Sequence, residues 1–120
     1  MKIVTEQKEK ISIIRLFGEL DASNAIEVDV ALERVLKNKP TQIWVDGSEI
    51  NYISSAGIGV FSSHLQTISR ENINLVFYGL NSKIRNVFTI LGLESILQIV
   101  NDQQAAEALL LQPATLTANN

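Results

Sequence analysis

Hydrophobic residues recur along this chain with two spacings, one typical of strands and one typical of helices. Compact runs rich in Ile, Val and Phe predict strands at residues 3–5, 11–17, 42–45, 73–78 and 96–100. Between these runs, apolar residues three or four positions apart predict four amphipathic helices. Their inward-facing positions are Ala25, Val28, Leu32, Val35 and Leu36, then Ile58, Phe61, Leu65 and Ile68, then Ile84, Val87, Phe88 and Leu91, and finally Ala105, Ala106, Leu109 and Leu110.

Turn and capping residues separate these elements. A charged turn at 7–10 joins the first two strands into a hairpin, and Gly18 is expected to end the second strand. Pro40 and Gly92 follow the ends of the first and third helices. Helix-capping side chains are predicted at Asp21, Ser23, Asn24, Asn81, Ser82 and Asp102. We therefore predict a single α/β domain, with a mixed, mostly parallel sheet, an N-terminal edge hairpin, right-handed crossovers and about four helices.

The stretch 42–61 carries the candidate site. Its first strand is followed by Asp46, Gly47 and Ser48, which favour a turn, so we expect the chain to leave the sheet there. Ser54 and Ser55 then precede the apolar face of the second helix, and both are candidates for its N-cap. Two hydroxyls would thus lie at the positive end of a helix dipole, where anions are stabilised.

Composition places the chain among ordinary globular proteins. Hydrophobic residues make up 46% of its 120 residues and charged ones 19%, which suits one domain with a real core. The net charge of -3 disfavours non-specific binding to nucleic acid or anionic membranes. The chain has no cysteine, no apolar run long enough to span a bilayer and no secretory signal, so we expect a cytoplasmic protein. We assign 1–111 to the domain and 112–120 to a flexible tail.

The central stretch, residues 42–61, does not match the pattern of a catalytic site. Ser55 and Gly57 partly match the nucleophile elbow G-x-S-x-G, but Ile53 stands where the first glycine is needed. The only histidine, His64, lies about 2.5 turns along the same helix, too far to act as a base for Ser55. We interpret His64 as a solvent or boundary residue of the helix, and we expect no enzymatic activity.

Cofactor and metal sites are disfavoured as well. Gly57 and Gly59 match two positions of a dinucleotide-binding motif, but the acidic ribose partner expected about 20 residues later is missing. Asp21 and Asp46 are possible Mg²⁺ ligands, although a helix cap and a turn explain them better. We therefore expect neither a cofactor nor a metal.

Two motifs resemble those of a known family. Residues 52–60, YISSAGIGV, preceded by Asp46-Gly47-Ser48, resemble the signature of the STAS domain family, the bacterial anti-sigma factor antagonists. Residues 18–21, GELD, look like the second motif of this family, and the resemblance spans roughly residues 1–111. In well-known members the signature reads Asp-Ser-Ser/Thr-Gly, and the hydroxyl after the Asp is phosphorylated. On that alignment Ser55 is the phosphoacceptor, with Ser54 as the alternative, while Ser54 replaces the Asp and Ala56 the second hydroxyl.

The resemblance implies a phosphorylation-controlled binding switch. Unphosphorylated, the protein would sequester an anti-sigma factor with serine kinase activity, and phosphorylation at Ser55 would release it. A metal-dependent serine phosphatase would reset the switch. The implied partner-binding residues are Gly18, Glu19, Asp21, Asp46, Ser48, Ser54, Ser55, Ala56 and Gly57.

The two departures from the family signature leave a second hypothesis open. STAS-like domains also serve as scaffold or accessory subunits, in stress-signalling assemblies or lipid-transport complexes, without a phosphorylation cycle. Ser54 and Ala56 are the positions that favour this alternative.

Overall fold

Five strands form one sheet in the order of the sequence. The computed structural model describes residues 1–95 and 97–111. The strands are β1 (Lys2–Lys8), β2 (Ile11–Leu20), β3 (Gln42–Ile53), β4 (Asn74–Tyr78) and β5 (Gln98–Val100). β1 pairs antiparallel with β2, and β2 to β5 pair in parallel, so that β1 and β5 are the edges. The predicted α/β architecture with an N-terminal edge hairpin is confirmed.

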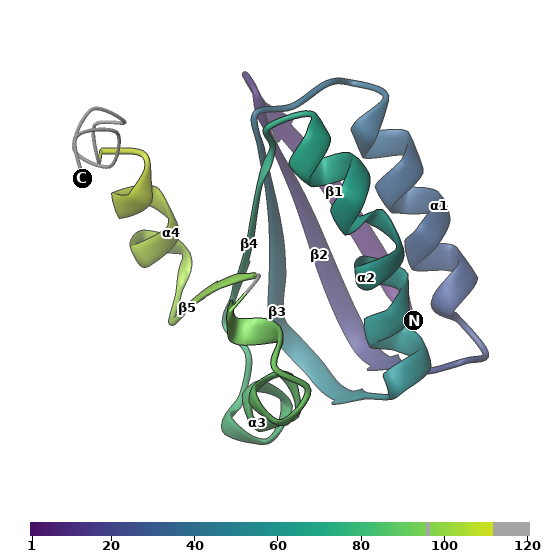
Figure 1. Cartoon of the computed structure of the whole chain (residues 1–120). Helices are drawn as coiled ribbons and strands as arrows, with labels where there is room; N and C mark the ends of the chain where they lie inside the picture. The colour runs from purple at the N-terminus through teal and green to yellow at the C-terminus, as the bar shows by residue number, and fades with distance from the viewer. Residues whose placement is uncertain (96, 112–120) are drawn as a thin grey trace.

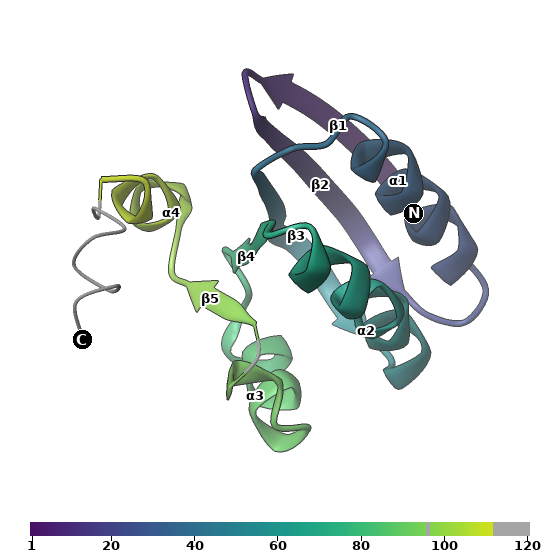
Figure 2. The ribbon, with the colours of Figure 1, turned by 45° about the horizontal axis from the view of Figure 1, so that its top comes forward.

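The helices lie on both faces of this sheet. They are α1 (Ala25–Leu36), α2 (Ser55–Arg70), α3 (Ser82–Ile90) and α4 (Gln103–Leu109), with a short 3₁₀ helix at Leu93–Ser95. Because each parallel strand is added on the same side of the preceding one, right-handed crossovers bring α1, α2 and α3 to one face. Figures 1 and 2 show α1 and α2 side by side over this face, and α4 on the opposite side near β4 and β5. None of the helices in the described part of the chain is long and apolar enough to span a bilayer.

Each face has its own apolar core. On the larger side, Phe77 of β4 lies edge-on between Phe61 of α2 and Phe88 of α3, with ring centroids 4.9 and 5.3 Å apart. On the other side, Ala106 of α4 packs in a smaller cluster with side chains from the middle strands, including Trp44 and Tyr78. Adjacent residues of a strand point to opposite faces, and this alternation divides the sheet residues between the two clusters. Most predicted inward positions are buried or half-buried, but Leu91 and Leu110 are exposed.

The central strands are longer than the sequence predicted. The expectation that the chain leaves the sheet at Asp46–Ser48 is wrong, because β3 continues to Ile53. Opposite these residues the β2–β3 register shifts, placing an extra residue on β3 as in a β-bulge. Gly18 likewise does not end β2; it adopts a φ of 107° within the strand, which continues to Leu20. Turn-forming residues here distort two strands instead of ending them.

The last strand is shorter than predicted. β5 begins at Gln98, and Leu93–Ser95 forms the 3₁₀ helix after Gly92. Gly92 has a φ of 73°, which agrees with its predicted role at the end of α3. Ile96 and the predicted tail at 112–120 lie outside the described residues.

The start of α2 packs tightly against the end of β2. A Cβ atom at Gly57 would lie 2.6 Å from Leu20 Cγ and 3.0 Å from the Leu20 carbonyl oxygen, whereas one at Gly59 would meet nothing within 4 Å. We predict that Gly57→Ala destabilises the protein by about 1–3 kcal/mol through overpacking. Gly59→Ala should instead stabilise by roughly 0.5–1 kcal/mol, because alanine favours helix interiors. Urea unfolding of both variants tests this, and equal effects would contradict the packing.

Burial of Tyr78 predicts a specific alkaline loss of stability. Tyr78 is 3% exposed, and its hydroxyl has no hydrogen-bond partner among the described residues. Burial is the main cause that raises the pKa of Tyr78 to about 12, and the negative charge of Asp46 is the second cause. The phenol of the unfolded chain ionises near its ordinary pKa of 10.0. Between these values the folded state holds the proton that the unfolded state has lost, so stability falls as pH rises.

Tyr78→Phe removes this contribution, and its free energy of unfolding should decline less between pH 10 and about 12 than that of the wild type. Tyr52→Phe is the matched control, because Tyr52 is 50% exposed. Chemical unfolding at pH values across this window measures the difference. If Tyr78→Phe and Tyr52→Phe follow the same curve, burial of Tyr78 does not restrict its ionisation.

Candidate functional site at the start of helix α2

The two serines before α2 have different environments. Ser54 is the N-cap: its half-buried hydroxyl accepts a hydrogen bond from the Gly57 amide at 3.2 Å, and its own amide donates to the Leu20 carbonyl at 2.9 Å. Ser55 is the first residue of the helix and is exposed, and no hydrogen bond engages its hydroxyl among the described residues. The sequence left both serines as cap candidates, and the structure assigns the cap to Ser54 alone. The Ser55 hydroxyl is therefore free to react.

The start of α2 suits an added anion, and the two segments that carry the motifs contain no cationic side chain. The first turn of α2 carries no acidic residue, and unpaired backbone amides point out of this helix end. Residues 16–33 and 47–69, which include both motifs, contain no Lys or Arg. A phosphate on Ser55 would thus be favoured by the helix dipole, with no basic side chain from these two segments to neutralise it.

The GELD motif folds into the turn beside this helix start. Leu20 pairs with Ile53 at the ends of β2 and β3, so the turn that follows Leu20 lies next to Ser54. Asp21 accepts hydrogen bonds from the hydroxyl and amide of Ser23, which lower the pKa of its carboxyl group. Asn24 accepts from the Asp21 amide and donates to the Glu19 carbonyl.

These contacts correct one detail of the sequence analysis. Asn24 occupies the N-cap position of α1, but its side chain does not cap the helix. The polar side chains predicted to cap α1 instead hold the turn together. In contrast, Asn81 and Asp102 cap α3 and α4 through their side chains, as predicted.

A shallow groove runs between α1 and α2 from this point. Its volume is about 440 Å³, and it is lined by Ala22, Ala25, Ile26, Asp29, Ala56, Gly59, Val60 and Ser63. Ile26 is 72% exposed, a large apolar side chain outside the buried stripe of α1. The small residues Ala56 and Gly59 keep the α2 side of the groove open. The sequence analysis missed Ile26, although its position off the buried face was the available signal.

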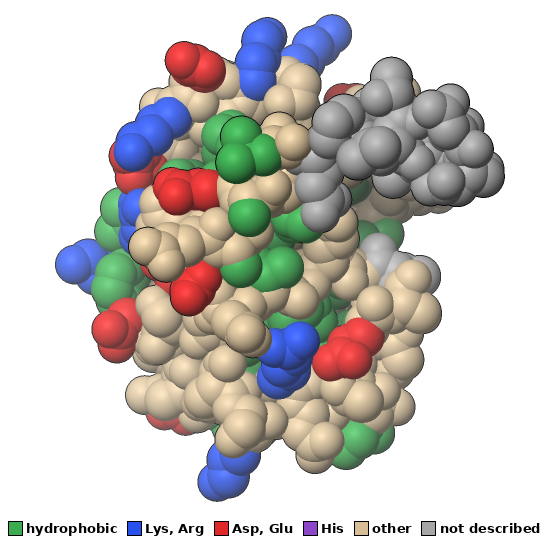
Figure 3. Space-filling view, turned by 90° about the vertical axis from the view of Figure 1, so that its left-hand side faces the viewer, with side chains coloured by type: hydrophobic (Ala, Val, Ile, Leu, Met, Phe, Trp, Pro, Cys, Tyr) green, Lys and Arg blue, Asp and Glu red, His purple; other side chains and the backbone are tan. Residues whose placement is uncertain are grey.

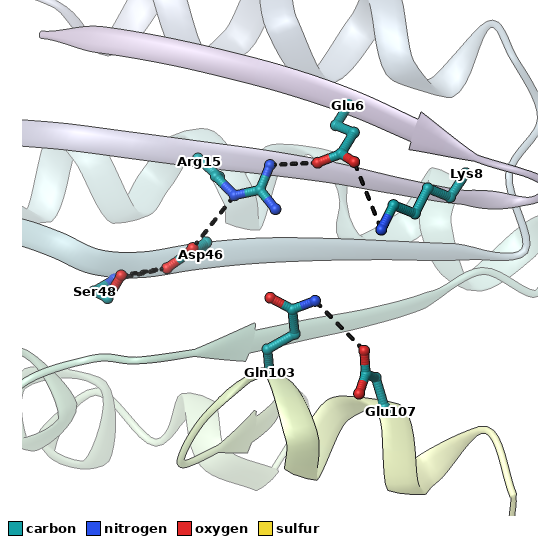
Figure 4. A network of polar contacts seen from close by, with 7 residues as sticks. All are labelled: Glu6, Lys8, Arg15, Asp46, Ser48, Gln103 and Glu107. Atoms are coloured by element: carbon teal, nitrogen blue, oxygen red, sulfur yellow. Dashed lines mark hydrogen bonds and ion pairs between the residues drawn. The ribbon is translucent and has the colours of Figure 1, made fainter.

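Asp46 and Ser48 lie elsewhere. Asp46 is level with Arg15 in the β2–β3 register, whereas Ile53 and Leu20 mark the end near Ser55. Its carboxylate accepts from the Ser48 amide and hydroxyl and lies 3.6 Å from Arg15 Nε (Figure 4). Asp46 is therefore not beside Asp21, and the two carboxylates do not form a common metal site.

The Arg15–Asp46 pair belongs to the sheet face that α4 only partly covers. Arg15 also binds Glu6 at 2.6 Å, an interaction that lowers the pKa of the Glu6 carboxyl group. Basic and acidic side chains are interspersed on the side of the molecule drawn in Figure 3, without a large patch of one sign. Of the nine residues singled out from the sequence, seven therefore gather at the helix start, and Asp46 and Ser48 lie along β3.

His64 is not placed to act as a base for Ser55. His64, the only histidine, places Nε2 2.6 Å from Asp29 Oδ1 of α1 and is thus engaged with another helix. The second hydroxyl beside Ser55, that of Ser54, is engaged in the helix cap, and the described residues include no cysteine. The site can present a hydroxyl and a groove to another molecule, which is an arrangement for binding.

Comparison with known proteins agrees with this fold. The chain is 34% identical over 104 residues to the anti-sigma-B factor antagonist of Listeria monocytogenes, covering 84% of this chain and 91% of that protein. Among solved structures, an anti-sigma factor antagonist from Mycobacterium paratuberculosis superimposes with a TM-score of 0.84 at 16% identity, covering 92% of this chain and 94% of the other. The unphosphorylated anti-sigma factor antagonist SpoIIAA gives 0.72 at 15% identity, with 92% and 97% covered.

The profile of the STAS domain matches residues 2–106, nearly the whole of the described domain. It includes both motifs and the helix start that presents Ser55. The protein belongs to the STAS domain family.

Proposed function

We propose that this protein is an anti-sigma factor antagonist that works in the cytoplasm as a phosphorylation-controlled binding switch. The observation that carries the proposal is that the hydroxyls of the two serines have different hydrogen bonding and exposure. Ser54 is committed to capping α2, and Ser55 presents an exposed, unengaged hydroxyl at the edge of an apolar groove. SpoIIAA, a relative in fold, has been solved in unphosphorylated and phosphorylated forms.

The unphosphorylated protein would bind an anti-sigma factor with serine kinase activity. Ile26 and the small residues of the groove offer an apolar contact, and Glu19 and Asp21 add negative charge beside it. A complementary partner surface is therefore apolar opposite the groove and brings no basic side chain to Ser55. Ser54, Ala56 and Gly57 form the helix start at the end of this groove, and Gly18 lies in β2 three residues before Asp21.

Phosphorylation of Ser55 adds about 1.5–2 negative charges at the groove edge. The phosphate would have to be desolvated in the complex, and the two segments that carry the motifs hold no Lys or Arg to compensate it. Helix amides favour the phosphate in both states, so it is the cost of desolvating the phosphate in the complex that makes modification favour the unbound form. A metal-dependent serine phosphatase would then restore binding.

Three variants test which hydroxyl is the switch. Ser55→Ala should abolish phosphate incorporation by the cognate serine kinase and leave the affinity for the anti-sigma factor unchanged, because it deletes one exposed hydroxyl. Ser54→Ala should keep the Ser55 acceptor and lose only the cap, at a cost of about 0.5–2 kcal/mol in folding stability. Ser55→Asp should bind the partner more weakly than wild type, although it carries less charge than phosphoserine.

Phosphate incorporation, mapped by mass spectrometry, and partner affinity are measured for all variants and the wild type. Phosphorylation that survives Ser55→Ala but not Ser54→Ala would identify Ser54 as the acceptor. If the wild type binds the anti-sigma factor but no kinase modifies it, the protein is a constitutive scaffold or accessory subunit, the alternative that Ser54 and Ala56 favour.

A further inference from the structure

A histidine and two carboxylates converge between α1 and α2, away from the serine pair. Asp29 and Glu33 are one helical turn apart on α1, and His64 reaches them from α2. The potential ligand atoms of the three side chains all lie within 4.8 Å of one another. His64 and Asp29 are partly buried, and Glu33 is exposed at the rim. The sequence analysis considered only Asp21 and Asp46 as metal ligands and did not foresee this cluster.

No lysine or arginine compensates the negative charge of the two carboxylates in this cluster. No Lys or Arg forms an ion pair with Asp29 or Glu33 among the described residues. Residues 16–33 contain five acidic residues and no basic one. Arg34, the next residue, lines a different groove, between α1 and β1. Like charges one turn apart on a helix repel each other, so a cation at this point would remove an unfavourable interaction.

We propose that Asp29, Glu33 and His64 form a binding site for a divalent cation of the zinc type. An imidazole nitrogen with two carboxylate oxygens is a ligand set that Zn²⁺ accepts, with bonds of about 2.0–2.2 Å. Ligand atoms of a tetrahedral ion are then roughly 3.3–3.6 Å apart. The three atoms already lie near that spacing: the 2.6 Å His64–Asp29 contact must open slightly and the exposed Glu33 side chain must turn inward.

The nitrogen ligand sets the selectivity of this site. Mg²⁺ prefers an octahedral shell of oxygen ligands and retains several waters, so it gains little from His64. Co²⁺ and Ni²⁺ accept imidazole as Zn²⁺ does. With only three protein ligands, the remaining position is open to water at the exposed rim.

A bound ion would join α1 directly to α2. Asp29 is also a lining residue of the groove between these helices, so the ion would fix one border of that groove. Because the ligands come from two helices that meet only in the folded protein, binding should favour the native state. The proposal concerns cation binding alone and does not depend on the phosphorylation switch.

The test is a metal titration of the full chain, purified without a histidine tag. His64 is the only histidine, so its two imidazole carbon-bound proton signals report on one site. We expect Zn²⁺ to shift these signals with one-to-one stoichiometry and to raise the thermal unfolding midpoint, and an equal concentration of Mg²⁺ to do neither. Imidazole signals that do not respond to Zn²⁺ would overturn the proposal.

Comparison of two Glu→Gln variants distinguishes a specific Zn²⁺ site from adventitious Zn²⁺ binding. Glu33→Gln removes one exposed ligand and should weaken Zn²⁺ binding about tenfold or more. Glu27→Gln, an exposed acidic position on the same helix outside the cluster, should leave the affinity unchanged. His64→Gln should abolish the thermal stabilisation by Zn²⁺. If Glu33→Gln and Glu27→Gln bind Zn²⁺ equally well, the ion is adventitious only, and the proposal fails.

Discussion

The arrangement of this site depends on one close contact, between the start of α2 and the end of β2. Gly57 places its backbone directly against Leu20, where even a Cβ atom has no room, and the Ser54 amide donates to the Leu20 carbonyl. Leu20 is itself fully buried, so the helix start rests on the core of the domain. This contact fixes the orientation of the first helical turn, and with it the positions of Ser54 and Ser55.

This orientation gives Ser54 a structural role and leaves Ser55 accessible for chemistry. Ser54 turns its hydroxyl toward the helix amides and holds the cap, and Ser55, one residue later, faces solvent. A modification at Ser55 therefore changes the surface without removing a contact of the core. The neighbouring Asp21 accepts hydrogen bonds from Ser23 and stays in the turn instead of capping α1. A rigid base with an exposed hydroxyl is what a reversible binding switch requires.

Local pattern predicted most of the fold because the buried positions repeat with clear periods. Ile58, Phe61 and Ile68 are buried on α2 as expected. The spacing of apolar residues also predicted the alternation of strands and helices, and with it the crossovers. Asp46–Ser48 and Gly18 lie within strands that were predicted to end there, because the residue types that end strands also form bulges within them. Which outcome occurs depends on pairing with β2, a long-range contact that neighbouring residues do not encode. The cluster of Asp29, Glu33 and His64 was invisible for the same reason, since it joins two helices.

We propose that the functional surface is the start of α2 with the groove behind it, and not the sheet face that carries Asp46. The most direct measurement is the change in backbone amide NMR signals when the unphosphorylated protein binds an anti-sigma factor. We expect changes concentrated in residues 18–26 and 54–63, with the signals of Arg15, Asp46 and α4 unaffected. Changes centred on Arg15, Asp46 and α4, with an unperturbed start of α2, would contradict it.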